Sequence, residues 1–395
     1  MEWFYVLNFR RKRVQSLWAY QIACKRGKIF CTRKYKRSRT KMKAFAVDEV
    51  HNTLEDPTFR AVELDLPHVG EHDVLMEVKA ISVNPLDVKR RMLAPVLESQ
   101  FQARVLGWDA SGLVTRIGEK VSLFKVGDEV YCAGEITRAG SYAQYLAVDE
   151  HIVGHKPRTL SFERSAALAL TSITAWEGLF ERLRIKPNFE SIKAPVAHPD
   201  KAQNRQKSIL IIGGAGGVGS MAIQLAKHVA GLHVVATASR AQSVQWCKDL
   251  GAHEVVDHTR DLVEQVRALG LKFVDHVFIL NDSDQHFDAA CELLAPQGLI
   301  CSIVPNQRPL NMDALRAKSA GLVWEGMFVR SKERTEDMLE QHHLLNEVSR
   351  LVDLGVLKDT STQVYSPIHA QHLRQAHLDL QTHRTIGKIV LAGFE

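Results

Sequence analysis

One short segment limits what this chain can fold into more than any other. Residues 208–227 read SILIIGGAGGVGSMAIQLAK, an unbroken apolar run followed by a glycine-rich turn and a helical apolar pattern. Gly214, Gly216 and Gly219 have the spacing of the dinucleotide-binding fingerprint, and the flanking strand and helix provide its context. We predict that Gly214 permits the turn, Gly216 lets the backbone approach a pyrophosphate, and Gly219 brings helix and strand close together.

The helix that follows begins at Gly217 and Val218, where free N–H groups and the helix dipole favour an anion. A glycine-rich turn can also be purely structural. The alternation of strands and helices downstream favours the phosphate-binding interpretation.

The rest of the chain predicts an α/β fold with two parts. After the glycine loop, apolar strand patterns alternate with helical ones, which is typical of a doubly wound parallel sheet of the Rossmann type. The strands are expected at Ile209–Ile212, His233–Ala238, Glu254–Asp257, His276–Leu280 and Leu299–Val304, with helices at Ala241–Leu250 and Asp261–Leu269. Upstream, short β-type runs predict a compact, mostly antiparallel domain, with strands at Lys43–Val47, Asp73–Val83, Gly112–Ile117, Glu129–Ala133 and Gln144–Ala147. A helical stretch at Ala166–Leu183 and a closing strand at Ile386–Leu391 complete the pattern.

The end of the second Rossmann strand predicts the cofactor. An NAD site places an acidic residue there, about 20 residues after the last glycine, to bind the ribose 2′-hydroxyl. This chain has Ser239 and Arg240 instead. A hydroxyl and a guanidinium favour a 2′-phosphate, so we expect NADPH rather than NADH. The alternative is that Arg240 only caps a solvent-facing helix end.

The charge of the chain is concentrated at its beginning. Residues 1–41 hold 13 Lys and Arg and one acid, whereas the whole chain has a net charge of +6, so the remainder is mildly acidic. The basic extension has three interpretations: a mitochondrial transit peptide, a tail for nucleic acid or a membrane surface, or a segment upstream of a true start at Met42. We favour the last, exclude residues 1–41 from the fold, and expect a cytoplasmic protein, or a mitochondrial one if the extension is a transit peptide.

Several classes of protein are unlikely on composition. Outside residues 1–41 the chain has no excess of positive charge of the kind that binds nucleic acid. No apolar run reaches the roughly 20 residues of a membrane span. The six cysteines are scattered and include no C-x-x-C pair, which indicates a reducing compartment and gives neither a disulfide framework nor a structural zinc lobe.

From Met42 to Glu395 the chain resembles the medium-chain dehydrogenases/reductases, on the quinone-oxidoreductase side and close to the zinc-type alcohol dehydrogenase-like proteins. The resemblance rests on ordered motifs: Val83-Asn84-Pro85-Leu86-Asp87, Gly107-Trp108-Asp109-x-Ser111-Gly112, Gly140-Ser141-Tyr142-Ala143, Leu170–Trp176, the glycine loop and Ile386–Val390. It implies a GroES-like domain at 42–167, completed by 331–395, and a Rossmann domain at 168–330. The active site is then expected in the cleft between the two.

Two departures from the family pattern determine the expected chemistry. The zinc alcohol dehydrogenases of this superfamily have Cys and His ligands where this chain has Asn84 and Trp108. An amide is a poor zinc ligand and an indole offers no lone pair, so we predict no catalytic metal. What remains is hydride transfer to an activated acceptor, a quinone or an enone, whose product anion is stabilised by conjugation. The alternatives are a zinc-dependent alcohol dehydrogenase with other ligands and a non-catalytic NADPH-binding protein.

The resemblance also implies roles for single residues. Asn84 is expected to bind the nicotinamide ribose or a substrate oxygen, with Asp87 and Tyr142 beside it as catalytic candidates. Asp87 has a helix cap as its alternative role. Three further residues are expected at the cofactor: Thr174 at a phosphate, His258 at the adenine pocket and Lys388 at the 2′-phosphate, unless Lys388 lies on the surface.

A last apolar run, Leu322–Val329, predicts one more strand at the edge of the Rossmann sheet. An exposed apolar edge favours pairing with a second copy, so we expect a homodimer. The alternative is that C-terminal helices of the same chain cover this strand. In the dimer, Met327 and Phe328 would at the same time approach the nicotinamide from the inner end of the strand, which would couple dimer formation to cofactor binding.

Overall fold

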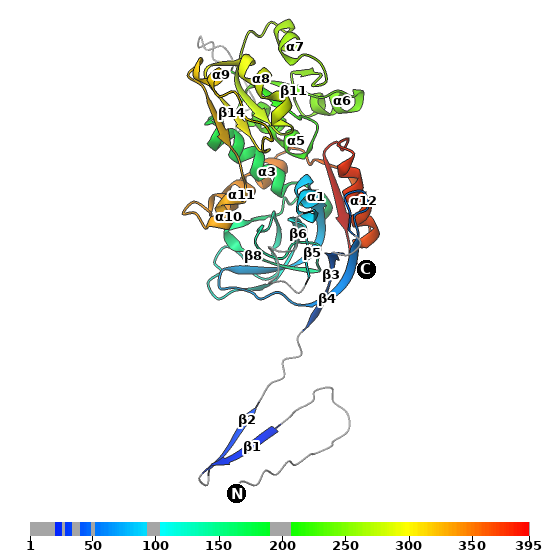
Figure 1. Ribbon diagram of the computed structural model, residues 1–395. Coiled ribbons are helices and arrows are strands. Elements are labelled where there is room, and N and C mark those ends of the chain that lie inside the picture. Colours follow the sequence, from blue (N-terminus) through cyan, green and yellow to red (C-terminus); the bar gives the residue numbers. More distant parts are fainter. Residues whose placement is uncertain are drawn as a thin grey trace. The chain divides into compact units, whose positions relative to one another are not determined.

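The computed structural model describes residues 20–25, 28–33, 40–48, 52–92, 103–189 and 207–394 (Figure 1). The chain divides into two compact units, Met1–Lys41 and Met42–Glu395. In the first unit, β1 (Tyr20–Lys25) and β2 (Lys28–Arg33) pair antiparallel. The hairpin was not anticipated from the sequence of the extension.

The Rossmann domain contains the parallel sheet that the sequence predicts. Its six strands run in the order β12-β11-β10-β13-β14-β15, and every neighbouring pair is parallel. This is the doubly wound order in which the chain reverses direction across the sheet between β10 and β13. The strands are β10 (Ser208–Ile212), β11 (His233–Thr237), β12 (Glu254–Val256), β13 (Val274–Ile279), β14 (Leu294–Ser302) and β15 (Gly321–Trp324).

The helices between these strands begin and end at the signals seen in the sequence. Asp261 caps α7 by accepting from the backbone N–H of Glu264, and Gly270 follows that helix with φ +82°. The helices are α5 (Gly217–Gln224, continued as a π-helical turn over Leu225–Val229), α6 (Ala241–Asp249), α7 (Leu262–Ala268), α8 (Ser283–Leu293) and α9 (Asp313–Arg316).

The second domain is built on a sheet in the order β16-β17-β5-β6-β7-β9, with β8 also pairing β5 and with β3 and β4 forming a separate pair. Figure 1 shows the C-terminal elements, in red, beside the blue and cyan strands. Because β17 pairs antiparallel with β5, the C-terminal strand of the chain belongs to the same sheet as strands from the first part of this domain. The strands are β3 (Lys41–Val47), β4 (Phe59–Asp65), β5 (Asp73–Val83), β6 (Asp109–Ile117), β7 (Glu129–Cys132), β8 (Tyr145–Asp149), β9 (Val153–His155), β16 (Ser361–Tyr365) and β17 (Lys388–Ala392).

Helices pack around this second sheet and connect it to the first. Helix α2 lies against β5, β6 and β17, and α11 lies against β9 and α3. The helices are α1 (Pro85–Arg91), the 3₁₀ turn η2 (Glu150–Ile152), α2 (Phe162–Ala166), α3 (Ala169–Trp176, followed by a π-helical turn over Glu177–Arg182), α10 (Val329–Glu333), α11 (Glu340–Asp353) and α12 (Ala370–Gln381).

One predicted strand is wrong in its second half. The run Leu322–Val329 was expected to be continuous, but β15 ends at Trp324 and the chain turns into α10. The backbone N–H of Glu325 still donates to the Ser302 carbonyl of β14 at 3.0 Å, and its buried carboxylate accepts a hydrogen bond from Arg182 Nε at 2.9 Å. Met327 and Phe328 therefore lie in the turn after the strand.

In the part of the chain that the structure describes, we find no helix with the length and apolar character needed to span a membrane.

Candidate active site

The glycine loop between β10 and α5 turns over residues 213–215, so Gly214 lies in the turn as predicted. The residue with a left-handed backbone is its neighbour Gly213, with φ +93°. A Cβ at Gly214 would lie 2.9 Å from the Cβ of Ala236, so its bare backbone permits close packing against β11.

The other two glycines occupy the positions expected of a phosphate loop. A Cβ at Gly219 would collide with the carbonyl oxygens of Gly213 and Gly214, so this residue brings helix and strand together. A Cβ at Gly216, the N-cap of α5, would meet nothing nearer than 3.7 Å. The open side of the loop therefore faces the free N–H groups of Gly217 and the partly buried Val218, an arrangement that fits a pyrophosphate.

Two arginines, Arg240 and Arg384, lie close together near the end of β11. Ser239 is exposed, and Arg240 follows it as the N-cap of α6. The Arg240 guanidinium donates to the backbone carbonyl of Arg384 at 2.6 Å, so the exposed Arg384 lies beside Arg240. His258 lies just beyond β12, partly buried, with its ring 6.4 Å from that of His286.

Lys388 lies beneath the glycine loop, and neither predicted role fits it. Its side chain is buried, and its ammonium donates to the Val83 carbonyl at 2.9 Å, to Asp109 Oδ2 at 3.0 Å and to the side-chain oxygen of Asn84. All three N–H donors are used inside the protein, so Lys388 neither lies on the surface nor has a donor for a 2′-phosphate. A Cβ at Gly217 would lie 2.7 Å from Lys388 Cδ, so this lysine packs directly below the start of α5.

The predicted contact of Thr174 with a cofactor phosphate stays a prediction. Its hydroxyl donates to the Leu170 carbonyl one helical turn back, at 2.8 Å. The threonine that packs against the loop is Thr171, whose methyl group would be 3.0 Å from a Cβ at Gly217.

Asp109 is the acceptor that joins this cluster. Its Oδ2 accepts from Ser82 Oγ and Asn84 Nδ2, each at 2.9 Å, besides Lys388. Its Oδ1 accepts from the backbone N–H of Leu170 at 2.8 Å, at the start of α3. The carboxylate thus connects β5, β6, β17 and α3 at one buried point.

Asp87 and Tyr142 lie next to this cluster, as predicted, but both are fully buried. Asp87 accepts from the backbone N–H of Asn84 at 2.6 Å, which is the capping role considered for it. Burial raises the pKa of Asp87 to about 7, partly offset by that N–H and by Lys388. The Tyr142 hydroxyl lies 3.0 Å from His377 Nε2, and burial raises the pKa of Tyr142 well above its ordinary value.

His377 completes the buried network and was missed from the sequence. It comes from α12, far along the chain, and stacks edge-on against Phe59. Burial, together with the nearby Arg91, lowers its pKa to about 3, so the imidazole is neutral. A histidine in a polar helical stretch carries no sequence signal for such a position.

Trp108 and Phe328 form the wall between the two domains. Their rings meet edge to face with centroids 6.1 Å apart, one from the segment before β6 and the other from the turn after β15. The indole N–H of Trp108 is buried and has no hydrogen-bond partner among the described residues. An unpaired buried donor at the contact between the two domains is a candidate partner for a ligand oxygen, which sequence reasoning had not assigned.

The residues at this position do not fit a catalytic zinc ion. The Asn84 amide is engaged by Asp109 and Lys388, and the Lys388 ammonium places a positive charge directly beside it. The Trp108 indole has a donor and no free lone pair. A metal ion bound at Asn84 would therefore have to displace the ammonium group of Lys388.

Comparison with known proteins agrees with this architecture. The sequence profile of the alcohol dehydrogenase GroES-like domain matches residues 70–158, and that of the zinc-binding dehydrogenase family matches residues 217–343. A zinc-type alcohol dehydrogenase-like protein of Staphylococcus aureus is 38% identical over 350 residues, covering 89% of this chain and 99% of the relative. An NADPH-dependent alkenal/one oxidoreductase of Arabidopsis thaliana chloroplasts is 35% identical over 214 residues, 51% of this chain and 49% of the relative.

A crystal structure gives the same result. A putative zinc-dependent alcohol dehydrogenase from Rhizobium etli superimposes with a TM-score of 0.81 at 43% identity, covering 90% of this chain and 99% of that one. The chain belongs to the medium-chain dehydrogenase/reductase superfamily, among its zinc-type alcohol dehydrogenase-like proteins.

Two glycines of the loop allow folding and binding to be separated. Gly219→Ala places a methyl group against two carbonyl oxygens, and we expect it to lower the free energy of unfolding by about 2–3 kcal/mol. Gly216→Ala has room and should leave stability nearly unchanged while weakening dinucleotide binding. Denaturant unfolding and fluorescence titration measure the two effects, and equal stability losses would contradict this assignment.

The raised pKa of Asp87 predicts a pH-dependent stability. The folded protein holds this proton more tightly than the unfolded chain. Protonation of Asp87 therefore contributes fully to the free energy of unfolding below about pH 4, and this contribution is lost as the pH rises toward 7. His377 has the opposite slope, because its stabilisation is lost as the pH falls from about 6.5 toward 3. We expect Asp87→Asn to gain stability relative to wild type between pH 4 and 7, by up to about 4 kcal/mol. Urea unfolding across this range tests it, and a constant difference would contradict the buried, protonated carboxyl.

Proposed function

We propose that this protein is an NADPH-dependent reductase of enones or quinones that works without catalytic zinc. The observation that supports the proposal is the Lys388–Asn84–Asp109 cluster directly below the glycine loop, in which a lysine engages Asn84, the residue that stands where the family resemblance puts a zinc ligand. Reduction of an acceptor whose product anion is stabilised by conjugation needs orientation and hydrogen bonding more than a Lewis acid.

The open loop supports a dinucleotide cofactor. Gly216 and the N-terminus of α5 would hold its pyrophosphate, and Ser239 with Arg240 would hold the 2′-phosphate, with Arg384 beside them. A bound nicotinamide cofactor supplies the hydride. The NADPH-dependent alkenal/one oxidoreductase among the relatives supports this choice.

Trp108 is positioned to act on the substrate. Its unpaired N–H would donate to the carbonyl or quinone oxygen, where negative charge develops as hydride arrives. Phe328 meets the indole edge-on and would align a planar acceptor beside it. Asn84, Asp87 and Tyr142 are buried behind this wall, so we assign them to positioning it rather than to substrate contact.

We further propose a homodimer formed through β15. This strand ends the six-stranded sheet among the described residues, and Trp324 on it is 46% exposed. Pairing of two such edges would make one continuous sheet across two copies.

The cofactor assignment predicts the effect of a charge reversal. Arg240→Asp should raise the dissociation constant for NADPH at least tenfold, because it places a carboxylate beside the 2′-phosphate. The preference for NADPH over NADH should become smaller. Arg260→Asp, in the exposed segment after β12, is the control. Titration of both cofactors measures the change, and a wild type that prefers NADH would refute the assignment.

The activity and the role of Trp108 are tested together. NADPH oxidation should be followed with a panel of enones, quinones and simple aldehydes, before and after dialysis against EDTA. We expect turnover of the first two classes, unchanged by EDTA, and a kcat/KM lowered 10- to 100-fold in Trp108→Phe with little change in NADPH affinity. Zinc-dependent alcohol oxidation would instead establish a metal-dependent dehydrogenase, and binding of NADPH with no turnover would establish a non-catalytic protein.

The dimer is tested by sedimentation of the full chain. Trp324→Glu should shift the protein to a monomer, whereas Val364→Glu, which is equally exposed on β16 of the other sheet, should not. A wild type that sediments as a monomer at micromolar concentration contradicts the proposal.

A further inference from the structure

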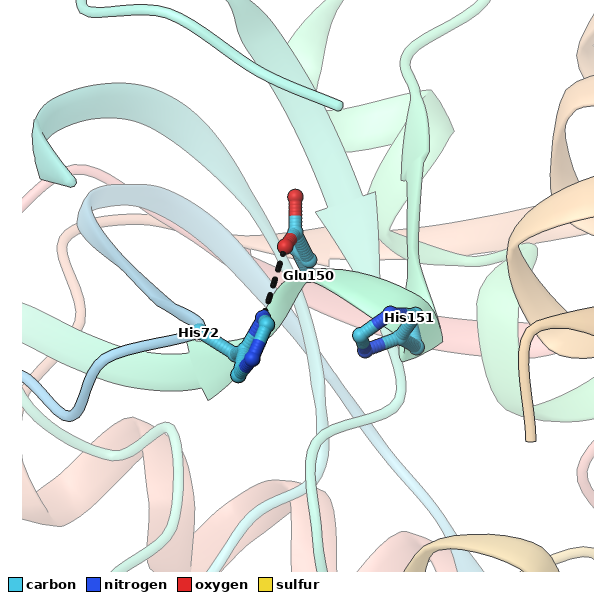
Figure 2. A group of neighbouring side chains, drawn as sticks. All are labelled: His72, Glu150 and His151. Atoms are coloured by element: carbon cyan, nitrogen blue, oxygen red, sulfur yellow. Dashed lines mark hydrogen bonds and ion pairs between the residues drawn. The ribbon is translucent and has the colours of Figure 1, made fainter. Parts of the chain in front are cut away.

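A group of potential metal ligands lies outside the cleft, at one end of the second sheet. It consists of His72, Glu150 and His151 (Figure 2). His72 lies in the turn before β5, and the other two belong to the 3₁₀ turn η2 directly after β8. Because β5 and β8 pair with Asp73 opposite Asp149, residues 78 positions apart in sequence meet here.

The three side chains have nearly the spacing of a coordination site. Their potential ligand atoms all lie within 4.8 Å of one another. His72 Nδ1 is 3.1 Å from Glu150 Oε1, close to the roughly 3.3 Å between two ligands of a tetrahedral zinc ion with bonds of about 2.0 Å. The rings of His72 and His151 have centroids 5.5 Å apart, so a small side-chain rotation closes the remaining distance.

Each ligand is held by neighbouring groups, as in established metal sites. The second oxygen of Glu150 accepts from the backbone N–H groups of Ser122 and Leu123, both at 2.8 Å. Asp149 Oδ1 lies 2.6 Å from His151 Nδ1, so this nitrogen donates and the lone pair is on Nε2. A carboxylate behind a histidine orients the ring and raises its basicity toward a metal.

The exposure of the group suits an ion that enters from solvent. The Glu150 side chain is 1% exposed, whereas those of His72 and His151 are 44% and 33% exposed. The buried Glu150 carboxylate thus lies beside two imidazoles that solvent can reach.

We propose that His72, Glu150 and His151 bind a divalent transition-metal ion of the zinc class, with water completing the coordination. Two imidazoles and one carboxylate favour Zn²⁺ over Mg²⁺ or Ca²⁺, which take oxygen ligands. Glu336 and Arg334, from the segment between α10 and α11, line the same hollow as His72 and His151 and supply one charge of each sign. The ion connects the turn before β5 to η2, so its role is to stabilise the domain, and it takes no part in hydride transfer.

The test uses the full chain without a polyhistidine tag, stripped with EDTA and titrated calorimetrically with ZnCl₂. We expect one Zn²⁺ per chain, a higher thermal midpoint with the ion, and no binding of Mg²⁺. His72→Ala and His151→Ala should each weaken binding at least tenfold, and Asp149→Asn should weaken it less. His343→Ala is the matched control, because this exposed histidine has a single carboxylate neighbour, Glu340, at 3.4 Å.

Two further measurements keep the result independent of folding and of the proposed function. Circular dichroism shows whether each variant folds. The visible spectrum of the Co²⁺-loaded wild type shows whether the ion is four-coordinate, and this measurement needs no variant. NADPH turnover should be the same with and without zinc in wild type and in His72→Ala. Absence of stoichiometric zinc in wild type, or unchanged affinity in both histidine variants, overturns the site. Turnover that needs zinc while His72→Ala still binds it would instead contradict the zinc-free reductase.

Discussion

The buried ion pair between Lys388 and Asp109 is the contact on which the arrangement of the cleft depends. It joins the C-terminal strand β17 to β6, and through Asn84 and Leu170 it reaches the β5–α1 junction and the start of α3. A buried pair of charges is tolerated only where other hydrogen bonds satisfy both partners, and here every N–H of the lysine has an acceptor. Removing either charge would leave the other unpaired, which costs about 3–5 kcal/mol. The lysine packs directly below the first turn of α5, so the same contact fixes the phosphate loop relative to the second domain.

This pair also sets the chemistry available in the cleft. The ammonium neutralises Asp109 and engages the Asn84 oxygen, so neither can serve a metal without expelling a lysine from the interior. The remaining group at the position of a zinc ligand is the Trp108 indole, which can only donate. A cleft with donors and aromatic walls suits an acceptor that carries its own electron sink, and this is why the proposed substrates are enones and quinones.

Much of this could be predicted from the sequence, and the failures have physical reasons. Periodicity and glycine punctuation located the Rossmann strands, most clearly β10 and β11, which are runs of buried, mainly apolar residues. Lys388 could not be placed, since its partner Asp109 is 279 positions away and a lysine ordinarily lies at the surface. The burial of Glu325 could not be predicted either, because its partner Arg182 is 143 positions away and such a contact leaves no trace in the hydrophobic pattern. Gly213 and Gly214 are adjacent in the same turn, and only the backbone angle shows that Gly213 is the left-handed one.

The second buried group, Asp87 with Tyr142 and His377, has a charge that suits the proposed reaction. Burial raises the pKa of Asp87 to about 7, holds Tyr142 protonated and keeps His377 neutral. Lys388 and Asp109 cancel, the buried Arg91 adds a positive charge beside Tyr142 and His377, and the pKa of about 7 leaves Asp87 about half protonated near neutral pH. Hydride transfer to a carbonyl or quinone creates an oxyanion, and an ionised carboxylate in this low-dielectric interior would oppose it strongly. Burial that raises the pKa of Asp87 lowers the fraction that is ionised and so reduces this penalty, while the Trp108 N–H is the donor proposed to act on the developing charge.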